Sequence, residues 1–592
     1  MIGSVLVANR GEIAVRLIRA YRALGLRAIA VYSDADAQAL HVRLADEARR
    51  LGPAPVTASY LNQDAILAAA RDAGADAVDP GYGLLSEDPG FAGAVAAAGL
   101  VFVGPPAAAI AAMGDKLAAR SIAREAGLPV VPGCGVIGHP EQGLTEAARL
   151  GYPVLVKAAG GGGGRGLRVA GGPAELPGAL AAAAAEAAAA FGRPQVYLER
   201  HVADARHVEV QLLADAHGTV LRLGDRDCSV QRRHQKLVEE APAPFLPGEV
   251  RAAMGSAAAR LAVTVGYQST GTAEFLYSPA SGEFWFLEMN TRLQVEHGVT
   301  ELVTGLDLVE RRLAVASGAP LGLTQEDIRI RGHAIEVRLA AEDPWREFLP
   351  VPGTITSLHV PAGPWLRADF GVEAGDAVPA EYDSMFGKLM AWGPDRETAR
   401  RRLIAALGEL RVSGLPSTAP YLRDVLGRPE FASGTHSTAT LEESWRPRPD
   451  RRPPAAEPGQ RDGARPGAAR PGTARTVEIR TNHGPFRVSI YGRPRPGPPV
   501  GRDQPAARGS GPRDGTGSLA AAGQPAAPMD GVVVEVAVAR GDVVEQHAVL
   551  VVLEAMKMQI PVTAPWPGEV RALLVAEGDS VTAGQPLAEI GA

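Results

Sequence analysis

Near the C-terminus, the sequence Glu554-Ala555-Met556-Lys557-Met558 places a lysine between two methionines. The segments on either side of it follow one pattern. An offset of 37 residues superposes Ala527-Pro528-Met529-Asp530-Gly531 on Ala564-Pro565-Trp566-Pro567-Gly568, and the same offset aligns Gly541-Asp542 with Gly578-Asp579. An internal repeat at a fixed spacing indicates duplicated structural units.

Each half of this repeat alternates apolar and polar residues, as in 532–536 and 569–573, which predicts short strands. Two such halves are expected to pack as a small, flattened two-fold β-sandwich, with Lys557 at the tip of a hairpin between them. A single lysine in a surface turn is usually only solvated. Here the two flanking methionines and the repeat favour a functional lysine.

This segment resembles the biotinyl domain of biotin-dependent carboxylases, whose Ala-Met-Lys-Met sequence carries biotin on the lysine amine. The related lipoyl domain has a lysine on the same hairpin but lacks the paired methionines. The resemblance implies covalent biotin on Lys557, attached by a biotin protein ligase. It also predicts that the rest of the chain loads this carrier.

Composition limits the remaining possibilities. A chain of 592 residues is long enough for several domains, and a charged fraction of 21% with a net charge of -6 predicts no nucleic-acid or membrane-surface partner. Cys134 and Cys228 have no metal-ligand spacing and suit a reducing compartment without disulfides. The start of the sequence has no basic n-region, and the alanine-rich run 179–190 contains Glu186, so we expect a cytoplasmic protein without a signal peptide or membrane span.

The first part of the chain alternates strand and helix patterns. Strand candidates at 4–8, 27–32 and 100–104 are separated by helical stretches such as 62–73, which predicts a parallel α/β domain over residues 1–112. No Gly-x-Gly-x-x-Gly follows the first strand, so a dinucleotide site is not indicated. The turn 79–83 lies at a strand end, where open α/β sheets present ligands, although its Tyr82 is by pattern alone more often a turn aromatic.

A glycine run follows the strand that ends in Lys157. Gly160 to Gly164 lack Cβ atoms, so their backbone N–H groups can close on a polyphosphate, and Lys157 and Arg165 supply cations at the two ends. Glycine runs are often only linkers. The lysine-terminated strand favours a mobile phosphate-covering loop, and the absence of Gly-Lys-Ser/Thr excludes a Walker loop.

The densest set of chemical groups lies at 272–296. Glu274 belongs to one predicted strand, and Glu288 and Asn290 belong to the next, so a hairpin directs all three side chains to one point. Two carboxylates and an amide oxygen are hard ligands suited to Mg²⁺ bound together with phosphates. The run 291–297 adds a cation, an amide and another carboxylate.

Residues 1 to about 445 resemble the biotin carboxylase module, which has an ATP-grasp fold. The matching signatures are 8–12, 113–116, Lys157 with the glycine run, 232–236, 288–297 and 336–338. The predicted fold class is therefore α/β plus all-β, an ATP-grasp biotin carboxylase followed by a linker and a biotinyl/lipoyl-type sandwich. The predicted domains are 1–112, an ATP-grasp domain 113–320 with a lid at about 133–203, a C-terminal domain 321–445, a linker 446–526 and a carrier 527–592.

The resemblance also implies a role for each matching residue. ATP is expected to contact Lys116, Lys157, Gly162, Gly163, Gly164, Glu199, His207, Gln231, His234, Leu276 and Glu288. Mg²⁺ or Mn²⁺ is expected at Glu274, Glu288 and Asn290. Bicarbonate is expected at Lys236, Arg292, Gln294, Val295 and Glu296, with Glu296 as its general base. Arg338 is expected to stabilise the biotin enolate, and Tyr82 to lie near the biotin ring; the catalytic set is Lys236, Arg292, Glu296 and Arg338.

The implied reaction phosphorylates bicarbonate to carboxyphosphate under the glycine lid, and biotin then captures the CO₂ released from it. Shielding by the lid protects carboxyphosphate from water. Four positions depart from the family pattern. Asp79, Leu84, Arg200 and Gly298 stand where members commonly have His, Phe, Lys and Pro, which affects fine placement of the nucleotide and biotin but not the reaction class.

The segment 446–526 is rich in Pro, Gly, Ala and Arg, which predicts a disordered linker, interrupted at 476–491 by one β-hairpin. Its last 35 residues, 492–526, span roughly 30–35 Å as a flexible coil, enough for the carrier to travel between sites. No segment of domain size is left for a carboxyltransferase. We therefore expect that a separate β subunit supplies the carboxyltransferase, and that the chain forms a homo-oligomer within a larger hetero-oligomer.

Three hypotheses follow. The first is the α chain of an acyl-CoA carboxylase acting on acetyl-CoA or propionyl-CoA, as in fatty acid biosynthesis. The second is the corresponding half of a pyruvate or urea carboxylase. The third is a non-catalytic carrier scaffold, which the presence of Lys236, Glu288, Arg292, Glu296 and Arg338 disfavours.

Overall fold

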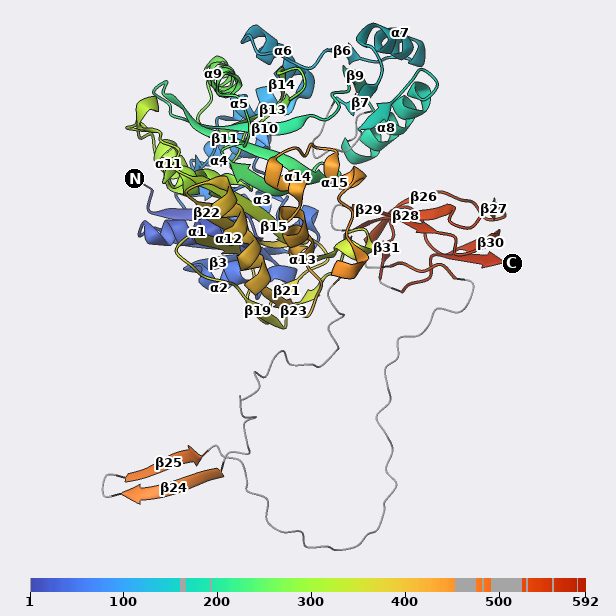
Figure 1. The fold of residues 1–592 in the computed structure, drawn as a ribbon. Helices are drawn as coiled ribbons and strands as arrows, with labels where there is room; N and C mark the ends of the chain where they lie inside the picture. Colours follow the sequence, from blue (N-terminus) through green and yellow to red (C-terminus); the bar gives the residue numbers. More distant parts are fainter. Residues whose placement is uncertain are drawn as a thin grey trace, which may run out of the picture.

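The structure is a computed structural model that describes residues 2–159, 167–191, 194–452, 475–481, 484–490, 524–528, 531–555, 558–582 and 584–591. The predicted phosphate contacts Gly162, Gly163 and Gly164 and the predicted biotin attachment site Lys557 lie outside the described residues. Figure 1 gives the arrangement of the elements.

The N-terminal part is a five-stranded parallel sheet in the order β3-β2-β1-β4-β5. Its strands are β1 (Ser4–Val7), β2 (Arg27–Ser33), β3 (Glu47–Gly52), β4 (Ala77–Asp79) and β5 (Val101–Phe102). The helices between them are α1 (Gly11–Ala23), α2 (Leu40–Leu44), α3 (Gln63–Asp72) and α4 (Pro89–Ala97). The apolar stripe of α1 packs on the sheet through Ile13, Leu17 and Ile18, the helical spacing that gives one buried face.

A small lid follows helices α5 (Ala107–Gly114) and α6 (Lys116–Glu125). The side chain of Asp115 caps α6 by accepting from the backbone N–H groups of Leu117 at 3.0 Å and Ala118 at 2.9 Å. The lid is a four-stranded antiparallel sheet in the order β6-β9-β7-β8, covered by two helices. Its elements are β6 (Gly133–Val136), α7 (Pro140–Leu150), β7 (Val154–Ala158), β8 (Arg168–Ala170), α8 (Leu176–Phe191) and β9 (Val196–Arg200).

The largest sheet has eight antiparallel strands in the order β14-β13-β10-β11-β12-β15-β22-β20. Its strands are β10 (Arg206–Ala214), β11 (Val220–Arg232), β12 (Gln235–Ala241), β13 (Ser269–Tyr277), β14 (Phe284–Asn290), β15 (His333–Ala340), β20 (Leu366–Phe370) and β22 (Met385–Gly393). The predicted hairpin of β13 and β14 is present. The sheet is continuous from the segment before residue 320 into the segment after it, because β12 pairs with β15.

Helices cover this sheet and bury two separate apolar cores. One core lies at β10, β13 and β14 with α9, and the other lies at β12, β15 and β22 with α12 and α13. The helices are α9 (Gly248–Thr264), α10 (His297–Thr304), α11 (Leu308–Ala316), α12 (Arg396–Glu409), α13 (Ala419–Leu426), α14 (Pro429–Ser433) and α15 (Thr440–Glu443). Short strands complete this part: β16 (Glu342–Asp343), β17 (Leu349–Pro350), β18 (Gly353–Thr354), β19 (Ser357–His359), β21 (Ala377–Val378) and β23 (Arg411–Ser413).

Two strands, β24 (Arg475–Thr481) and β25 (Gly484–Ile490), pair antiparallel at the position of the predicted hairpin. The C-terminal part is a sandwich of a four-stranded sheet, β29-β28-β26-β31, and a three-stranded sheet, β27-β30-β32. Its strands are β26 (Gly531–Val536), β27 (Val543–Val544), β28 (Val549–Ala555), β29 (Met558–Thr563), β30 (Gly568–Leu573), β31 (Ser580–Val581) and β32 (Ala588–Gly591).

The two halves of this sandwich repeat each other's contacts, as the 37-residue offset predicts. Gly541 donates its N–H to the carbonyl of Val570 at 2.8 Å, and Gly578 donates to the carbonyl of Val533 at 2.8 Å. Both glycines have positive φ, at 95° and 91°, a backbone conformation that favours glycine. Leu550 and its counterpart Leu587 are each 0% exposed in the shared core. The predicted pseudo-symmetric sandwich is confirmed.

Among the described residues, no helix is long and apolar enough to cross a bilayer. Both cysteines, Cys134 and Cys228, are free thiols.

Candidate active site

A cleft of about 1520 Å³ opens between the lid, the large sheet and the N-terminal sheet. All the predicted site residues that the structure describes line it, with the exception of Glu296. They are Tyr82, Lys116, Lys157, Glu199, His207, Gln231, His234, Lys236, Glu274, Leu276, Glu288, Asn290, Arg292, Gln294, Val295 and Arg338. Glu296 is fully buried directly behind the cleft wall.

The ammonium group of Lys236, on β12, stands at the centre of three carboxylates. Its Nζ donates to Glu209 Oε2 at 2.6 Å, to Glu274 Oε1 at 2.9 Å and to Glu296 Oε1 at 2.7 Å. Burial opposes the charge on Lys236, but the three carboxylates outweigh it and raise its pKa well above the ordinary value. This site therefore holds a fixed cation at neutral pH.

Glu296 is held by a cation on each of its two oxygens. Lys236 binds Oε1, and Arg338 Nη2 donates to Oε2 at 3.0 Å. Burial alone would raise the pKa of Glu296, but Lys236 and Arg338 hold it well below the usual range. Glu296 is thus an ionised carboxylate at neutral pH, the protonation state that a general base requires.

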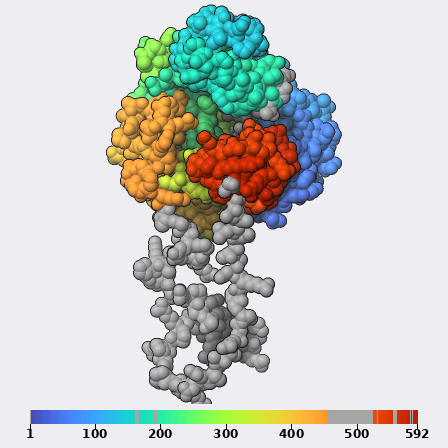
Figure 2. Space-filling view, turned by 90° about the vertical axis from the view of Figure 1, so that its right-hand side faces the viewer, coloured from blue at the N-terminus to red at the C-terminus, as the bar shows by residue number. Residues whose placement is uncertain are grey.

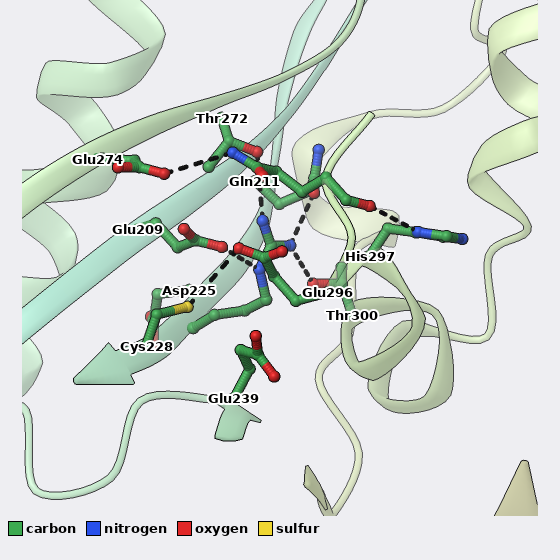
Figure 3. A network of polar contacts seen from close by, with 12 residues as sticks. Glu209, Gln211, Asp225, Cys228, Glu239, Thr272, Glu274, Glu296, His297 and Thr300 are labelled. Carbon is green, nitrogen blue, oxygen red and sulfur yellow. Dashed lines mark hydrogen bonds and ion pairs between the residues drawn. The ribbon is translucent and has the colours of Figure 1, made fainter. Parts of the chain in front are cut away.

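Arg338 joins Glu296 to a further carboxyl group, because its Nε donates to Glu239 Oε1 at 2.6 Å. Burial raises the pKa of Glu239 to about 7, although Arg338 lowers it. Figure 3 shows Glu209, Cys228 and Glu239 gathered around Glu296. The Cys228 Sγ lies 3.9 Å from Glu296 Oε1, and burial raises the pKa of this thiol well above its ordinary value.

Sequence reasoning missed two residues of this cluster, Glu209 and Arg226. Arg226 is fully buried, and its Nε donates to Glu209 Oε1 at 2.5 Å while its Nη1 donates to Gln211 Oε1 at 2.7 Å and Thr300 Oγ1 at 2.8 Å. This leaves Glu209 Oε2 for Lys236. The alternation of His207, Glu209 and Gln211 on β10 was the available signal, since residues two apart share one face of a strand.

The predicted metal ligands lie on the β13–β14 hairpin. Glu274 and Glu288 are directly opposite in the register, and Asn290 is two residues further on the same face. Asn290 Nδ2 donates to Glu274 Oε1 at 2.8 Å. Within the described part of the chain, the compact groups that could hold a cation are His207–Glu209–Glu274 and Glu209–Cys228–Glu296, and Glu288 belongs to neither.

Two carboxylates and an amide oxygen on one wall of the cleft fit a hard divalent cation such as Mg²⁺. Burial raises the pKa of Glu274, but Lys236 and His207 together lower it by more, so the pKa lies below the ordinary value. Glu274 is therefore ionised and can serve as a metal ligand. Glu288 lines the cleft, and its carboxylate has no hydrogen bond to any described residue, which leaves it available to the space that a nucleotide and a metal ion would share.

On the lid side, Lys157 Nζ lies 3.2 Å from Glu199 Oε2, and Arg120 also pairs with Glu199. Both partners of the Lys157 pair are nearly buried and lie on the neighbouring strands β7 and β9. The lid therefore presents a lysine and a carboxylate to the cleft from two paired strands. Lys116 reaches the same cleft from the start of α6.

Arg292 lines the cleft just beyond the end of β14 and binds its neighbours. Its Nη1 donates to Gln294 Oε1 at 2.9 Å and its Nη2 to Asn290 Oδ1 at 3.1 Å. Its Nε donates to Glu87 Oε2 at 2.8 Å. Glu87 was not among the predicted site residues, and the sequence offers no signal for a contact that joins positions 205 residues apart.

Tyr82 reaches the cleft from the turn after β4, and its hydroxyl donates to Glu12. Two of the four departures from the family pattern, Asp79 and Gly298, have clear structural neighbours. Asp79 is fully buried and accepts from Gly81 N–H at 2.7 Å and Arg312 Nη2 at 3.0 Å. A Cβ on Gly298 would collide with Met390 Sδ, so the bare glycine makes room for that methionine.

The C-terminal sandwich lies at the mouth of this cleft. Gly531, Val532 and Val534 of β26 and Val581 of β31 contribute to its lining. Figure 2 shows the sandwich seated against the catalytic body beneath the lid.

The fold and the site define a class: an ATP-grasp ligase with a lid, joined to a lysine-bearing carrier of the biotinyl/lipoyl type. Four family models match the chain: "Biotin carboxylase, N-terminal domain" at 1–110, "Carbamoyl-phosphate synthase L chain, ATP binding domain" at 115–324, "Biotin carboxylase C-terminal domain" at 336–443, and "Biotin-requiring enzyme" at 524–590.

The chain belongs to the biotin carboxylase family, fused to a biotin carrier domain. It is 49% identical to biotin carboxylase of Haemophilus influenzae over 75% of this chain and 98% of that protein. It is 46% identical to the propionyl-CoA carboxylase alpha chain of Ruegeria pomeroyi (75% and 68% covered) and 46% identical to a pyruvate carboxylase subunit of Methanothermobacter thermautotrophicus (75% and 90%).

Solved structures give the same result. A biotin carboxylase from Campylobacter jejuni superposes with a TM-score of 0.73 at 44% identity, covering 75% of this chain and 99% of that one. The biotin carboxylase domain dimer of Hydrogenobacter thermophilus 2-oxoglutarate carboxylase, in complex with MgADP, ADP and bicarbonate, also gives 0.73, at 43% identity and with 75% and 98% covered. The predicted fold class, the biotin carboxylase activity and the requirement for biotin and ATP are confirmed.

Proposed function

We propose that this chain carboxylates biotin carried on Lys557, using ATP and bicarbonate, and delivers the carboxyl group to a separate carboxyltransferase subunit of an acyl-CoA carboxylase. Attachment of biotin to Lys557 requires a biotin protein ligase. The catalytic units are proposed to assemble as a homo-oligomer within a larger complex; the related 2-oxoglutarate carboxylase domain was solved as a dimer.

The observation that carries the catalytic proposal is the pairing of Glu296 with Lys236 and Arg338. This arrangement supports three roles: binding of bicarbonate, removal of its proton, and stabilisation of the charges that result. Bicarbonate is an anion and binds beside Lys236, Arg292 and Arg338, with the Val295 backbone and Gln294 completing the site. Glu296 accepts the bicarbonate proton. Lys236 and Arg338, which bind the two oxygens of Glu296, stabilise the negative charge of Glu296 before the transfer and of bicarbonate after it.

The deprotonated bicarbonate oxygen then forms a bond to the γ-phosphorus of ATP, and the bond from that phosphorus to the ADP oxygen breaks. Lys116, Lys157 and His234 are proposed to hold the polyphosphate for this step, together with Gly162, Gly163 and Gly164. Glu199, His207, Gln231 and Leu276 are proposed to hold the rest of the nucleotide. The carboxyphosphate product breaks down to CO₂ and phosphate inside the closed cleft, where water is excluded.

Mg²⁺, or Mn²⁺ in its place, would be held by Glu274, Glu288 and Asn290 and would supply neutralisation of the developing phosphate charge. The related 2-oxoglutarate carboxylase domain holds MgADP. Phosphate takes up the N–H proton of biotin as the ring nitrogen bonds to CO₂. Arg338 is proposed to stabilise the ring oxygen during this step, and Tyr82 to lie beside the ring.

The acceptor is proposed to be acetyl-CoA or propionyl-CoA, supported by 46% identity to a propionyl-CoA carboxylase alpha chain. An equal identity of 46% to a pyruvate carboxylase subunit supports a second candidate, the corresponding half of a split carboxylase for a 2-oxo acid. A urea carboxylase half fits the same catalytic chemistry. Purification of the assembled complex, followed by carboxylation assays with each acceptor, separates the candidates.

The test of the catalytic proposal is bicarbonate-dependent ATP hydrolysis by the purified chain with free biotin, together with its intact mass. We expect one biotin added per chain and ATP hydrolysis that biotin stimulates. The Lys557→Ala variant is expected to lose the added mass and to keep the activity with free biotin. Biotin addition without ATP hydrolysis would leave a carrier scaffold; ATP hydrolysis without biotin addition would point to another acceptor.

A further inference from the structure

A buried lysine outside the proposed site holds part of its wall. Lys388, on β22, is 0% exposed, and its Nζ donates to the carbonyl oxygen of Val295 at 2.5 Å. Lys388 stands opposite Arg338 in the β15–β22 register, so the two cations lie side by side on one face of the sheet. The proposed mechanism gives Lys388 no role.

The contact fixes a peptide group in the bicarbonate wall. A second buried side chain does the same one residue earlier: His297 Nδ1 lies 2.8 Å from the carbonyl oxygen of Gln294. A trans peptide places its N–H opposite its C=O. The two contacts therefore turn the N–H groups of Val295 and Glu296 away from Lys388 and His297.

These N–H groups are free to bind an anion. Neither the Val295 N–H nor the Glu296 N–H donates a hydrogen bond to any residue in the part of the chain that the structure describes. Val295 lines the cleft. An adjacent pair of oriented backbone N–H groups is a common way of binding an anion.

A buried carboxylate holds Lys388 in place. Glu12, at the start of α1 and 2% exposed, has its Oε1 at 3.4 Å from Lys388 Nζ, and the same carboxylate accepts from the Tyr82 hydroxyl. Burial opposes the charge on Lys388, but Glu12, Glu336 and Asp369 raise its pKa above the ordinary value. The Lys388 ammonium is therefore charged at neutral pH. Its partner Glu12 also contacts Tyr82, the residue proposed to lie beside biotin.

We propose that Lys388, held by Glu12, is a positioning residue that aligns the Val295 peptide for bicarbonate, and that Glu12 couples this wall to Tyr82. The inference rests on the proposed function for the identity of the anion. It adds two positioning residues to the proposed site. Lys388 acts on the bicarbonate wall, and Glu12 joins that wall to Tyr82 on the biotin side of the cleft.

The test is the double variant Glu12→Gln/Lys388→Met, which removes both charges of this pair together, so that neither is left without the other. Loss of one charge-assisted hydrogen bond predicts a KM for bicarbonate raised roughly tenfold to a hundredfold, with the KM for ATP unchanged. Amide hydrogen exchange in residues 291–297 is expected to accelerate. Glu12→Gln alone keeps the shape of the side chain and is expected to raise the bicarbonate KM by roughly threefold to tenfold.

The matched control is Glu240→Gln/Arg396→Met. It removes another ion pair, in which the half-buried Arg396 places its nitrogens 2.6 Å and 2.9 Å from the oxygens of the buried Glu240. This pair has no hydrogen bond or ion pair with the residues of the bicarbonate wall in the described part of the chain. We expect this control to lower the melting temperature without changing the KM for bicarbonate or the exchange of 291–297.

An unchanged bicarbonate KM in a folded Glu12→Gln/Lys388→Met variant overturns the proposal, as does an equal change in the control. If the wild-type chain shows no bicarbonate-dependent ATP hydrolysis, the proposed function fails instead. Hydrogen exchange then decides on its own: faster exchange in 291–297 confined to the Glu12 and Lys388 variants supports the positioning role, and equal exchange rejects it.

Discussion

The catalytic cleft and the carrier sandwich are built on opposite principles. In the cleft, buried charges hold one another across long sequence distances: Lys236 meets Glu296 60 residues away, and Arg292 meets Glu87 205 residues away. In the sandwich, the core is apolar, and its two halves reproduce the same contacts 37 residues apart, as the Gly541 and Gly578 hydrogen bonds do.

The difference shows where each region is vulnerable. Removing one partner from a buried charge cluster leaves another charge without compensation, which strongly destabilises the site. Removing an apolar side chain from a repeated core leaves a cavity, whose cost depends on local packing. Four predictions test this contrast, from the largest expected free-energy change to the smallest.

The largest effect is expected in the carrier core. Leu550→Ala and Leu587→Ala each remove a side chain that is 0% exposed, at equivalent positions of the repeat. Each is expected to destabilise the sandwich by about 3–5 kcal/mol, because a cavity adds to the lost burial. Hydrogen exchange of the sandwich in the full chain measures this. ATP hydrolysis with free biotin is the control and should not change; a large effect at only one leucine would disprove the equivalence of the halves.

The next effect is in the cleft. Lys236→Met leaves Glu209, Glu274 and Glu296 without their shared cation. We expect kcat for bicarbonate-dependent ATP hydrolysis to fall roughly 10²- to 10³-fold, about 3–4 kcal/mol, the scale of losing one preorganised donor. Biotin addition at the carrier should be unaffected. A fall below fivefold would remove Lys236 from the catalytic set.

A pH effect is expected at the edge of the cleft. Burial raises the pKa of Glu342 from 4.5 to about 7, although the Ser384 hydroxyl lowers it. The folded chain therefore binds this proton more tightly than the unfolded chain, and its stabilising contribution, complete below pH 4.5, is lost as pH rises to about 7.

Glu342→Gln removes that dependence. At pH 8 the variant is expected to be more stable than the wild type by about 1–3 kcal/mol, and at pH 4.5 the difference should vanish. Urea unfolding at several pH values, followed by tryptophan fluorescence, measures it. A difference that is constant with pH would show that Glu342 titrates normally.

The smallest effect is expected at two exposed turns of the sandwich. Asp542 and Asp579 each accept a backbone N–H at 2.8 Å, from Ala539 and Ala576. Replacing either aspartate by alanine should cost about 0.5–1.5 kcal/mol, the usual net value of one hydrogen bond. Equal costs at the two turns would extend the repeat to its loops, and Asp542→Asn, which keeps the acceptor, serves as the control.

The two regions also differ in how far the sequence predicts them. The sandwich could be predicted from the residues, because a repeat such as Leu550 and Leu587 shows which positions are equivalent in two duplicated units. The β13–β14 hairpin that carries Glu274 and Glu288 was equally predictable from alternation. Both leave a record in the sequence itself, a repeat at a fixed spacing in one case and alternation of apolar and polar residues in the other.

Much of the cleft depends on contacts that no local pattern records. Glu209 and Arg226 were missed, since a charged residue on a half-buried strand looks like a solvated one until its partner is known. Glu87 and Lys388 were missed because their partners are distant in sequence. The roles assigned to Lys236, Glu296 and Arg338 came from the resemblance to a family, and the geometry of their pairing emerged only in three dimensions.

The eight-stranded sheet that joins the ATP-binding and C-terminal parts of the catalytic body limits where the chain can be divided. The ATP-binding match ends at residue 324 and the C-terminal match begins at 336, yet β12 and β15 pair across that gap. A gene cut there would put Lys236 and Arg338 on different polypeptides and expose the unpaired edges of two strands, which favours aggregation. We therefore expect that the chain tolerates division in the segment 446–526, ahead of the carrier, better than division between residues 324 and 336.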